Sequence, residues 1–402
     1  MVATKMTPNR VPKKSTALAQ LTQSALAIVS STSGVAVAAE APTDAQLDLR
    51  FTQYREADMP EERVTLGDRE RYAIDVTQFR MFSPVGTTSA ISLDLMYETM
   101  SGASPLGSQL NNSDQTEVLM SGASIEETRT DVALGWHQYS KYRTYSWSLA
   151  SSIENDYESI ALGWDFAIEN RKRWLTLLSS LSASYDTLSP TDADVFGGPR
   201  AEADGETKTS VSAYGGFNAV VNAMTTVQMG VGFTQLDGYL SDPYRGADQR
   251  PDQRQQVTLD VQIRRYLGWL GAAWHVDYRY YQDDWEIKAH TIEQHVYKQW
   301  DLGSGSILVS PSLRYYWQHQ ASFYQLNASP STEFYSSDYR LSAYGAAAVG
   351  LDLTWDWHNW GVQLGYSLYL SDESWGASGQ QDTETPSLVD FTTVSFGLFT
   401  RF

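Results

Sequence analysis

The chain has 402 residues, of which 12% are aromatic, and a formal net charge of −19 at pH 7. It contains no cysteine, which excludes disulfides, thiolate metal sites, covalent haem attachment and cysteine nucleophiles. The acidic balance argues against a nucleic-acid partner, and the absence of a long apolar run excludes a membrane-spanning helix.

Residues 1–38 predict a cleaved export signal. Four basic residues precede an uncharged stretch over residues 15–39, and Ala36, Val37 and Ala38 fit the small-x-small cleavage pattern. We therefore expect a signal peptide cut after Ala38 and a single domain over residues 39–402. Because the apolar stretch is short and interrupted by Ser, Thr and Gln, a basic tail is the alternative.

From residue 47 onward, apolar and polar residues alternate with a period of two, which predicts strands with one apolar face. The first two strands are expected at residues 47–56 and 64–82. The alternation is clearest at 91–98, 160–169, 274–281 and 360–368.

The links between these segments alternate between short and long, as the periplasmic turns and extracellular loops of an outer-membrane barrel do. Two links on the long side are short instead, at 155–158 and 283–284. We predict a transmembrane antiparallel up-and-down β-barrel of about sixteen strands, with fourteen or eighteen as alternatives. The short links lie near 83–88, 139–142, 170–172, 222–225, 268–270, 301–304 and 356–359, and the long ones near 101–123, 187–207, 241–253, 322–337 and 372–387.

The C-terminal segment is similar to the signal by which outer-membrane barrels are recognised for assembly. Phe396, Leu398 and the terminal Phe402 alternate on one face, and Gly397 lies between them. Thr400 departs from the pattern, because an aromatic residue is usual at that position. The expected partners are therefore the barrel assembly machinery, outer-membrane lipid and lipopolysaccharide. The sequence predicts no particular oligomeric state.

A short motif occurs twice. Met100-Ser-Gly-Ala-Ser104 recurs as Met120-Ser-Gly-Ala-Ser124, and Arg50-Phe-Thr-Gln-Tyr-Arg-Glu56 lies near the expected mature start. With these segments the chain resembles a family of uncharacterised Gram-negative outer-membrane proteins that is classed only as a domain of unknown function. The resemblance implies a leader, successive β-hairpins and a C-terminal Phe, and it implies no catalytic residue.

The two motif copies flank one long loop. Glycine permits backbone conformations closed to other residues, and serine hydroxyls cap turns. The copies are expected either to shape a rigid hairpin at the barrel rim or to hold a loop over or inside the pore mouth. The residues concerned are Ser101, Gly102, Ser104, Ser121, Gly122 and Ser124.

Charged and histidine residues on the polar faces of the strands are expected to line the pore. Acids outnumber bases among them, and facing charges of both signs predict a transverse field across the bore, with cations favoured. The alternative is a network of ion pairs that plugs a narrow barrel. The predicted pore-lining residues are Asp94, Glu98, Asp131, His137, Asp165, Glu169, Asp260, Arg264, His275, Asp277, Arg279, Arg314 and Asp352.

No cofactor, metal or catalytic motif emerges from the sequence. His290 and His295 are five residues apart, which places them on opposite faces of a strand and prevents joint chelation. The main functional hypothesis is a cation-favouring, porin-like channel. The alternatives are an occluded structural or docking barrel and a barrel hydrolase whose Ser-His pair sequence alone cannot align.

Overall fold

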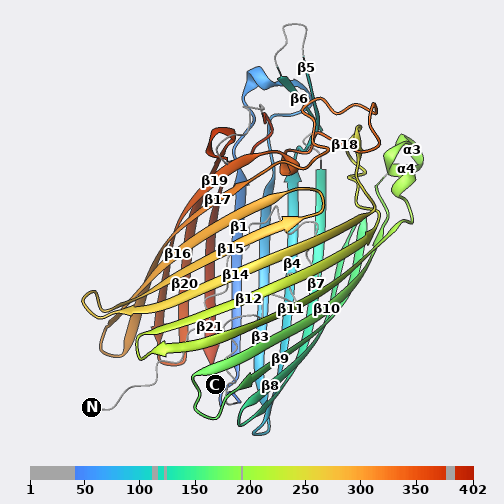
Figure 1. Ribbon diagram of the computed structural model, residues 1–402. Coiled ribbons are helices and arrows are strands. Elements are labelled where there is room, and N and C mark those ends of the chain that lie inside the picture. Colours follow the sequence, from blue (N-terminus) through green and yellow to red (C-terminus); the bar gives the residue numbers. More distant parts are fainter. Residues whose placement is uncertain (1–40, 111–115, 122–124, 192, 377–384) are drawn as a thin grey trace.

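The computed structural model describes residues 41–402 apart from 111–115, 122–124, 192 and 377–384. Sixteen antiparallel strands form a closed barrel, each hydrogen-bonded to its neighbours, with β1 pairing β21 to close the ring (Figure 1). The predicted fold class and strand number are confirmed. The barrel strands are β1 (Gln46–Glu56), β3 (Ala73–Val85), β4 (Ser89–Gly102), β7 (Ile125–Ser140), β8 (Arg143–Glu154), β9 (Tyr157–Glu169), β10 (Leu175–Leu188), β11 (Thr207–Asn222), β12 (Thr225–Gly238), β14 (Gln253–Leu267), β15 (Ala272–Asp283), β16 (Lys288–Asp301), β17 (Gly305–Gln318), β19 (Tyr344–Trp357), β20 (Trp360–Asp372) and β21 (Phe391–Arg401).

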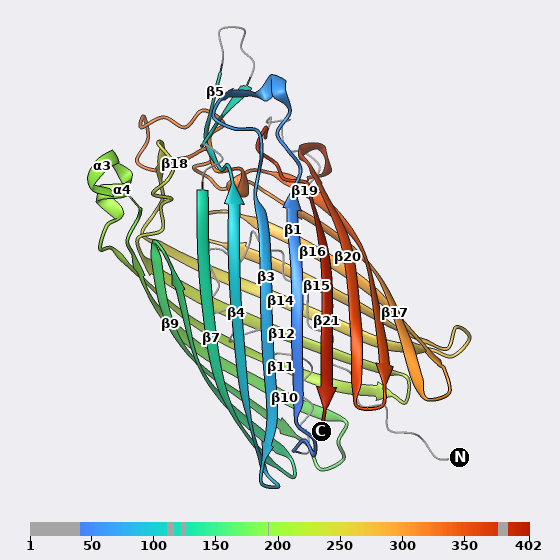
Figure 2. The ribbon, with the colours of Figure 1, turned by 180° about the vertical axis from the view of Figure 1, so that it is seen from behind.

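Tight turns lie at one end of the barrel, together with the C-terminus, and the long connections lie at the other end, which we call the outer mouth (Figures 1 and 2). The predicted signal peptide at residues 1–38 lies outside the described residues. The long connections carry short elements of their own: η1 (Glu61–Arg63), β2 (Val64–Leu66), β5 (Pro105–Leu110), β6 (Thr116–Met120), α3 (Ala193–Phe196), α4 (Pro199–Ala203), β13 (Asp248–Gln249), β18 (Tyr335–Ser336), η2 (Tyr339–Leu341) and η3 (Glu373–Trp375).

The strand predicted at residues 64–82 is wrong in its first half. Residues 64–66 form β2, which pairs with β6 in a small three-stranded sheet above the barrel, with β5 on the other side of β6. The wall strand β3 begins at Ala73. Gly67 separates the two, with φ +91° and a backbone so close to Met120 O that a Cβ would lie 2.1 Å from it. Only glycine fits such a turn, and the chain leaves the strand direction there.

The two faces of each strand differ as the alternation predicts. On β9, the side chain of Leu162 is 61% exposed, whereas Ala161 next to it is 1% exposed. Large apolar side chains are exposed in this way on strands all around the ring, and they form the outer face that lipid would cover. Among the described residues, no helix has the length and apolarity needed to cross a bilayer.

The seam between β1 and β21 is fastened beyond both ends of its ladder. At the end with the tight turns, Ala45 and Phe402 exchange two backbone hydrogen bonds of 2.8 and 3.0 Å. At the outer mouth, Arg71 forms a 2.7 Å ion pair with Glu56 at the end of β1 and donates to the carbonyl of Ser387, which precedes β21. The side chains of this ion pair are 2% and 0% exposed.

Candidate functional site: the pore and its outer mouth

One side of the inner wall is lined mainly by small side chains. On β8 and β9 the inward positions carry mainly serine, alanine and glycine, such as Ser152 and Ala161. Tyr214 on β11 lies flat against this side, because a Cβ on Gly230 would come within 2.0 Å of its hydroxyl oxygen. Glycine opposite the ring therefore keeps a large side chain out of the lumen.

A charged side faces the lumen on β14 and β15. Arg264 pairs with Asp277, and Arg279 pairs with Asp260, both at 2.7 Å. The Arg279 side chain is 59% exposed although it points inward from the middle of a strand. The lumen is therefore hollow beside this side chain.

A second charged group lies on β3, β4, β7 and β8. Arg80 pairs with Asp94 at 2.6 Å. Arg129 contacts Asp131 at 2.9 Å and Glu154 at 3.4 Å, and its register partner on β4 is Glu98. The predicted set omitted both arginines and Glu154, although counting outward from the tight turn at residues 86–88 places Arg80 opposite Asp94.

These ion pairs lie within one strand or join neighbouring strands, and they do not cross the bore. The charges therefore pair locally along the wall, whereas charges of opposite sign were expected to face one another across the lumen. Two further predicted residues follow the same rule, since Asp165 accepts a hydrogen bond from Ser180 and Glu169 pairs with Arg173 in the adjoining turn.

Three further predicted positions lie on β15, β17 and β19. His275 is the register partner of His295 on β16, and its ring lies 4.5 Å from that of Tyr297. Arg314 is the register partner of Glu293, and Asp352 faces Ser310. The sequence thus identified inward positions, but Glu293 and His295, joined by a 2.7 Å contact, were missed.

His290 and His295 occupy opposite faces of β16, as the spacing predicts. His290 stacks on Trp317 and faces Tyr278 on the outer face, and His295 contacts Glu293 inside. Within the described part of the chain, no group of three or more His, Asp or Glu residues is arranged to hold a metal ion.

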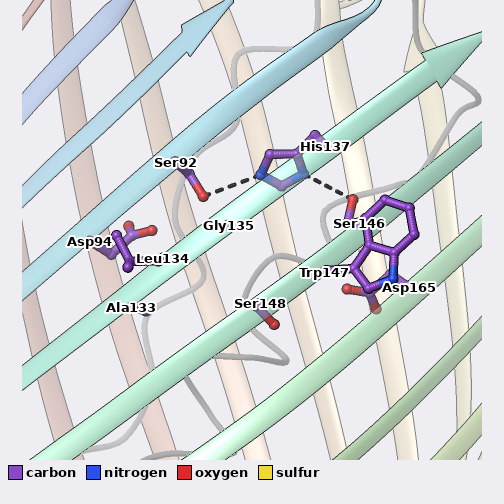
Figure 3. Close-up of a pocket in the computed structure, with 10 residues that line it drawn as sticks. All are labelled: Ser92, Asp94, Ala133, Leu134, Gly135, His137, Ser146, Trp147, Ser148 and Asp165. Atoms are coloured by element: carbon purple, nitrogen blue, oxygen red, sulfur yellow. Dashed lines mark hydrogen bonds between the residues drawn. The ribbon is translucent and has the colours of Figure 1, made fainter. Parts of the chain in front are cut away.

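His137 lies in a shallow recess of the inner wall (Figure 3). Its two ring nitrogens face hydroxyls, Ser92 at 3.2 Å and Ser146 at 2.9 Å. Gly135 makes the first contact possible, because a Cβ there would lie 2.2 Å from the Ser92 oxygen. A Ser-His contact between neighbouring strands is what the hydrolase hypothesis requires. Here, however, the second ring nitrogen faces a hydroxyl, where a hydrolase usually has an acid.

The repeated motif lies at the rim. Gly102 ends β4 with φ +121°, Ser104 and Ser121 bond through their backbones at 2.9 Å, and β5 and β6 form a hairpin between them. Ser101 belongs to β4. Gly122 and Ser124 lie outside the described residues.

The C-terminal segment forms β21. Phe396 and Leu398 are exposed on the outer face, and Gly397 faces inward opposite Gln363. Phe402 is also exposed. The structure thus has the alternating outward apolar residues that the assembly signal requires. Recognition by the assembly machinery stays a prediction.

The outer mouth is covered by long connections that contact one another. Residues 319–343, between β17 and β19, form what we call the plug loop, which crosses this end (Figures 1 and 2). It pairs through β18 with β13 of the β12–β14 connection, and Ser108 on β5 bonds to the carbonyl of Leu326. The sequence did not predict this loop as the one that enters the mouth.

The sequence family described as "Protein of unknown function (DUF3570)" matches residues 18–389. The chain belongs to this family. The family resemblance inferred from the repeated motif is thereby confirmed. No curated protein matches the chain with significant similarity.

The chain is similar to several solved structures at low identity. A chain described as "Bacterial polysaccharide outer membrane secretin" is 12% identical, with 89% of this chain and 98% of that chain covered and a TM-score of 0.49. CdiB from Escherichia coli is 10% identical, with 88% and 63% covered and a TM-score of 0.49. OccD3 (OpdP) from Pseudomonas aeruginosa is 9% identical, with 93% and 97% covered and a TM-score of 0.43.

Proposed function

We propose that the protein is a water-filled channel of the outer membrane that favours cations. A barrel of sixteen strands is wide enough for an aqueous bore. The exposure of Arg279 in the middle of the inner wall supports a hydrated lumen. The apolar outer face and the terminal strand support insertion into the outer membrane by the barrel assembly machinery, with lipopolysaccharide at the outer rim.

The observation that carries the cation preference is a group of acids near the outer mouth. Glu98, Glu127, Asp131 and Glu154 project inward from β4, β7 and β8. Asp131 and Glu154 contact the guanidinium of Arg129, and Glu98 is the register partner of Arg129. Unbalanced negative charge beside a pore raises the local cation concentration and lowers that of anions.

The test is the reversal potential of the purified protein in planar bilayers under a KCl gradient. We expect a potential of the sign that marks cation permeation. The double variant Glu98→Gln with Glu154→Gln should move it toward zero. Asp75→Asn is the matched control, since Asp75 forms an exposed ion pair with Arg55 on the outer face. Anion selectivity in the unmodified protein would contradict the proposal.

We also propose that the barrel has no hydrolase activity through His137. The backbone amides around Ser92 are engaged in the strand ladders with β3 and β7 and are not free to hold an oxyanion. A serine-reactive fluorophosphonate should not label the folded protein. Labelling that disappears in Ser92→Ala would favour the hydrolase.

A further inference from the structure

The plug loop packs into the barrel mouth on one side. Tyr339 forms a buried apolar cluster with Tyr54, Ile74 and Phe391, which point inward from β1, β3 and β21. Arg71 lies over its ring at 5.8 Å. From its own place between β17 and β19, the loop therefore reaches strands several positions away around the ring.

On its other side the plug loop packs against the short β15–β16 turn. A second buried cluster joins this turn to the plug loop. It contains Trp285 and Ile287 of the turn and Ala321, Phe323, Tyr324 and Leu341 of the loop. Ser322 donates a 2.9 Å backbone hydrogen bond to Trp285. With apolar anchors on both sides, the loop lies across the mouth as a packed element rather than as a solvated surface loop.

A group of charges fastens the plug loop to the β12–β14 connection. Asp338, whose side chain is fully buried, pairs with Arg250 at 2.9 Å, with Arg340 at 2.5 Å and with Arg245 at 3.5 Å. Arg340 also contacts Asp242 at 3.1 Å. We call these five residues, together with Asp248 and Ser336, the charge lock; Asp248 pairs with Arg250 and accepts from Ser336.

The charge lock depends on one carboxylate. Burial alone would raise the pKa of Asp338, but the charges of Arg245, Arg340 and Arg250 outweigh it and hold this pKa well below its usual value. Neutralising the side chain would leave three guanidinium groups close together in a buried place with less negative charge between them. Removing one partner of a buried ionic group is strongly destabilising for this reason.

We propose that the plug loop is a gate that closes the outer mouth and that the charge lock holds it shut. The gate deepens the proposed channel function and rests on it. Release of the lock would let residues 319–343 swing outward, because the backbone outside β18 and η2 makes no regular ladder there. The bore would then open to its full width.

The test measures single-channel conductance of the full chain in planar bilayers. Asp338→Asn should raise conductance about two-fold or more over the unmodified protein, since a barrel of this strand number is an open channel unless loops fill it. Tyr339→Ala removes an anchor on the opposite side of the mouth and should act in the same direction. If Asp338→Asn does not show the heat-dependent electrophoretic shift of a folded barrel, Tyr339→Ala serves as the test variant in its place.

A reversible disulfide, which we call the staple, distinguishes movement of the plug loop from a general loss of structure. The chain has no cysteine, and Gln249 and Tyr335 are register partners in the β13–β18 pair. Directly opposite residues of antiparallel strands are within disulfide reach. Oxidised Gln249→Cys with Tyr335→Cys, added to Asp338→Asn, should restore the low conductance, and a reductant should raise it again.

The outcomes distinguish the gate from the channel. A silent unmodified protein with a conducting Asp338→Asn variant would support the gate and contradict a constitutively conducting channel. Equal conductance in both, with Asp75→Asn as the folded control, would overturn the gate and leave the channel standing. A rise that the oxidised staple does not reverse would also overturn the gate, and silence in every folded variant would overturn both.

Discussion

Replacing Gly230 by alanine tests whether the ring of Tyr214 is held against the barrel wall. The added Cβ would lie 2.0 Å from the Tyr214 hydroxyl oxygen, 2.3 Å from its Cζ and 2.7 Å from its Cε2. The ring must therefore move by roughly 1 Å or more to reach ordinary contact distance, and overpacking of this kind costs about 1–3 kcal/mol. We expect the free energy of unfolding in Gly230→Ala to fall by that amount.

Urea titration of the folded barrel in lipid vesicles, followed by tryptophan fluorescence, measures this loss. Gly215→Ala is the control, because the adjacent strand β11 offers its Cβ open space, with no atom within 4 Å. That variant should be neutral or more stable by about 0.4–1 kcal/mol, since alanine restricts the unfolded chain.

A double-mutant cycle isolates the contact between the two residues. If the ring causes the penalty, Gly230→Ala should cost little in a Tyr214→Ala background, and the two changes should be non-additive. A loss that persists without the ring, or a Gly230→Ala protein within about 0.5 kcal/mol of the unmodified one, would refute the reasoning.

Further measurements follow from other contacts. Arg71→Ala leaves Glu56 buried without its partner and should lower the free energy of unfolding by about 3–5 kcal/mol, which an unchanged urea midpoint would contradict. Gly102→Ala, at φ +121° and with a Cβ 2.4 Å from Arg71 O, should cost about 1–3 kcal/mol and increase proteolysis at the rim; equal cleavage rates would count against strain there. Because the pKa of Asp338 is depressed, the lock is complete above the ordinary aspartate pKa of about 3.9 and is lost only as pH falls through the lower folded value, so conductance should not rise between about pH 7 and pH 5. Deletion of residues 106–119 should raise conductance less than Asp338→Asn does, since the apolar clusters in the mouth belong to the plug loop; the reverse order would make the β5–β6 hairpin the constriction.

The barrel itself is predictable from the sequence because its rule is local. Ile160 and Leu162 face outward and Ala161 faces inward for no other reason than the two-residue period of an extended chain. The tight turns then fix which strands are neighbours. Boundaries fail where the backbone leaves the strand direction without a change in polarity, as at Gly67, and this is how β2 was merged with β3.

The charge partners are only partly predictable. Asp94 faces inward by parity, and its partner Arg80 follows from counting across one turn. The charge lock joins Asp248 to Ser336, which are far apart in sequence and belong to irregular connections without a period. Such contacts depend on how loops fold over one another, and no local pattern specifies them.

The two fastenings of the β1–β21 seam bear on whether the barrel wall can open sideways. Barrels that release cargo sideways into the bilayer must separate a pair of neighbouring strands, and the strands that meet where the chain closes on itself are the natural place to do so. At one end of that junction Arg71, held by Glu56, donates to the carbonyl of Ser387, and at the other end Ala45 and Phe402 exchange two backbone hydrogen bonds. Lateral opening would have to break these hydrogen bonds together with the backbone ladder between β1 and β21, so this seam resists separation.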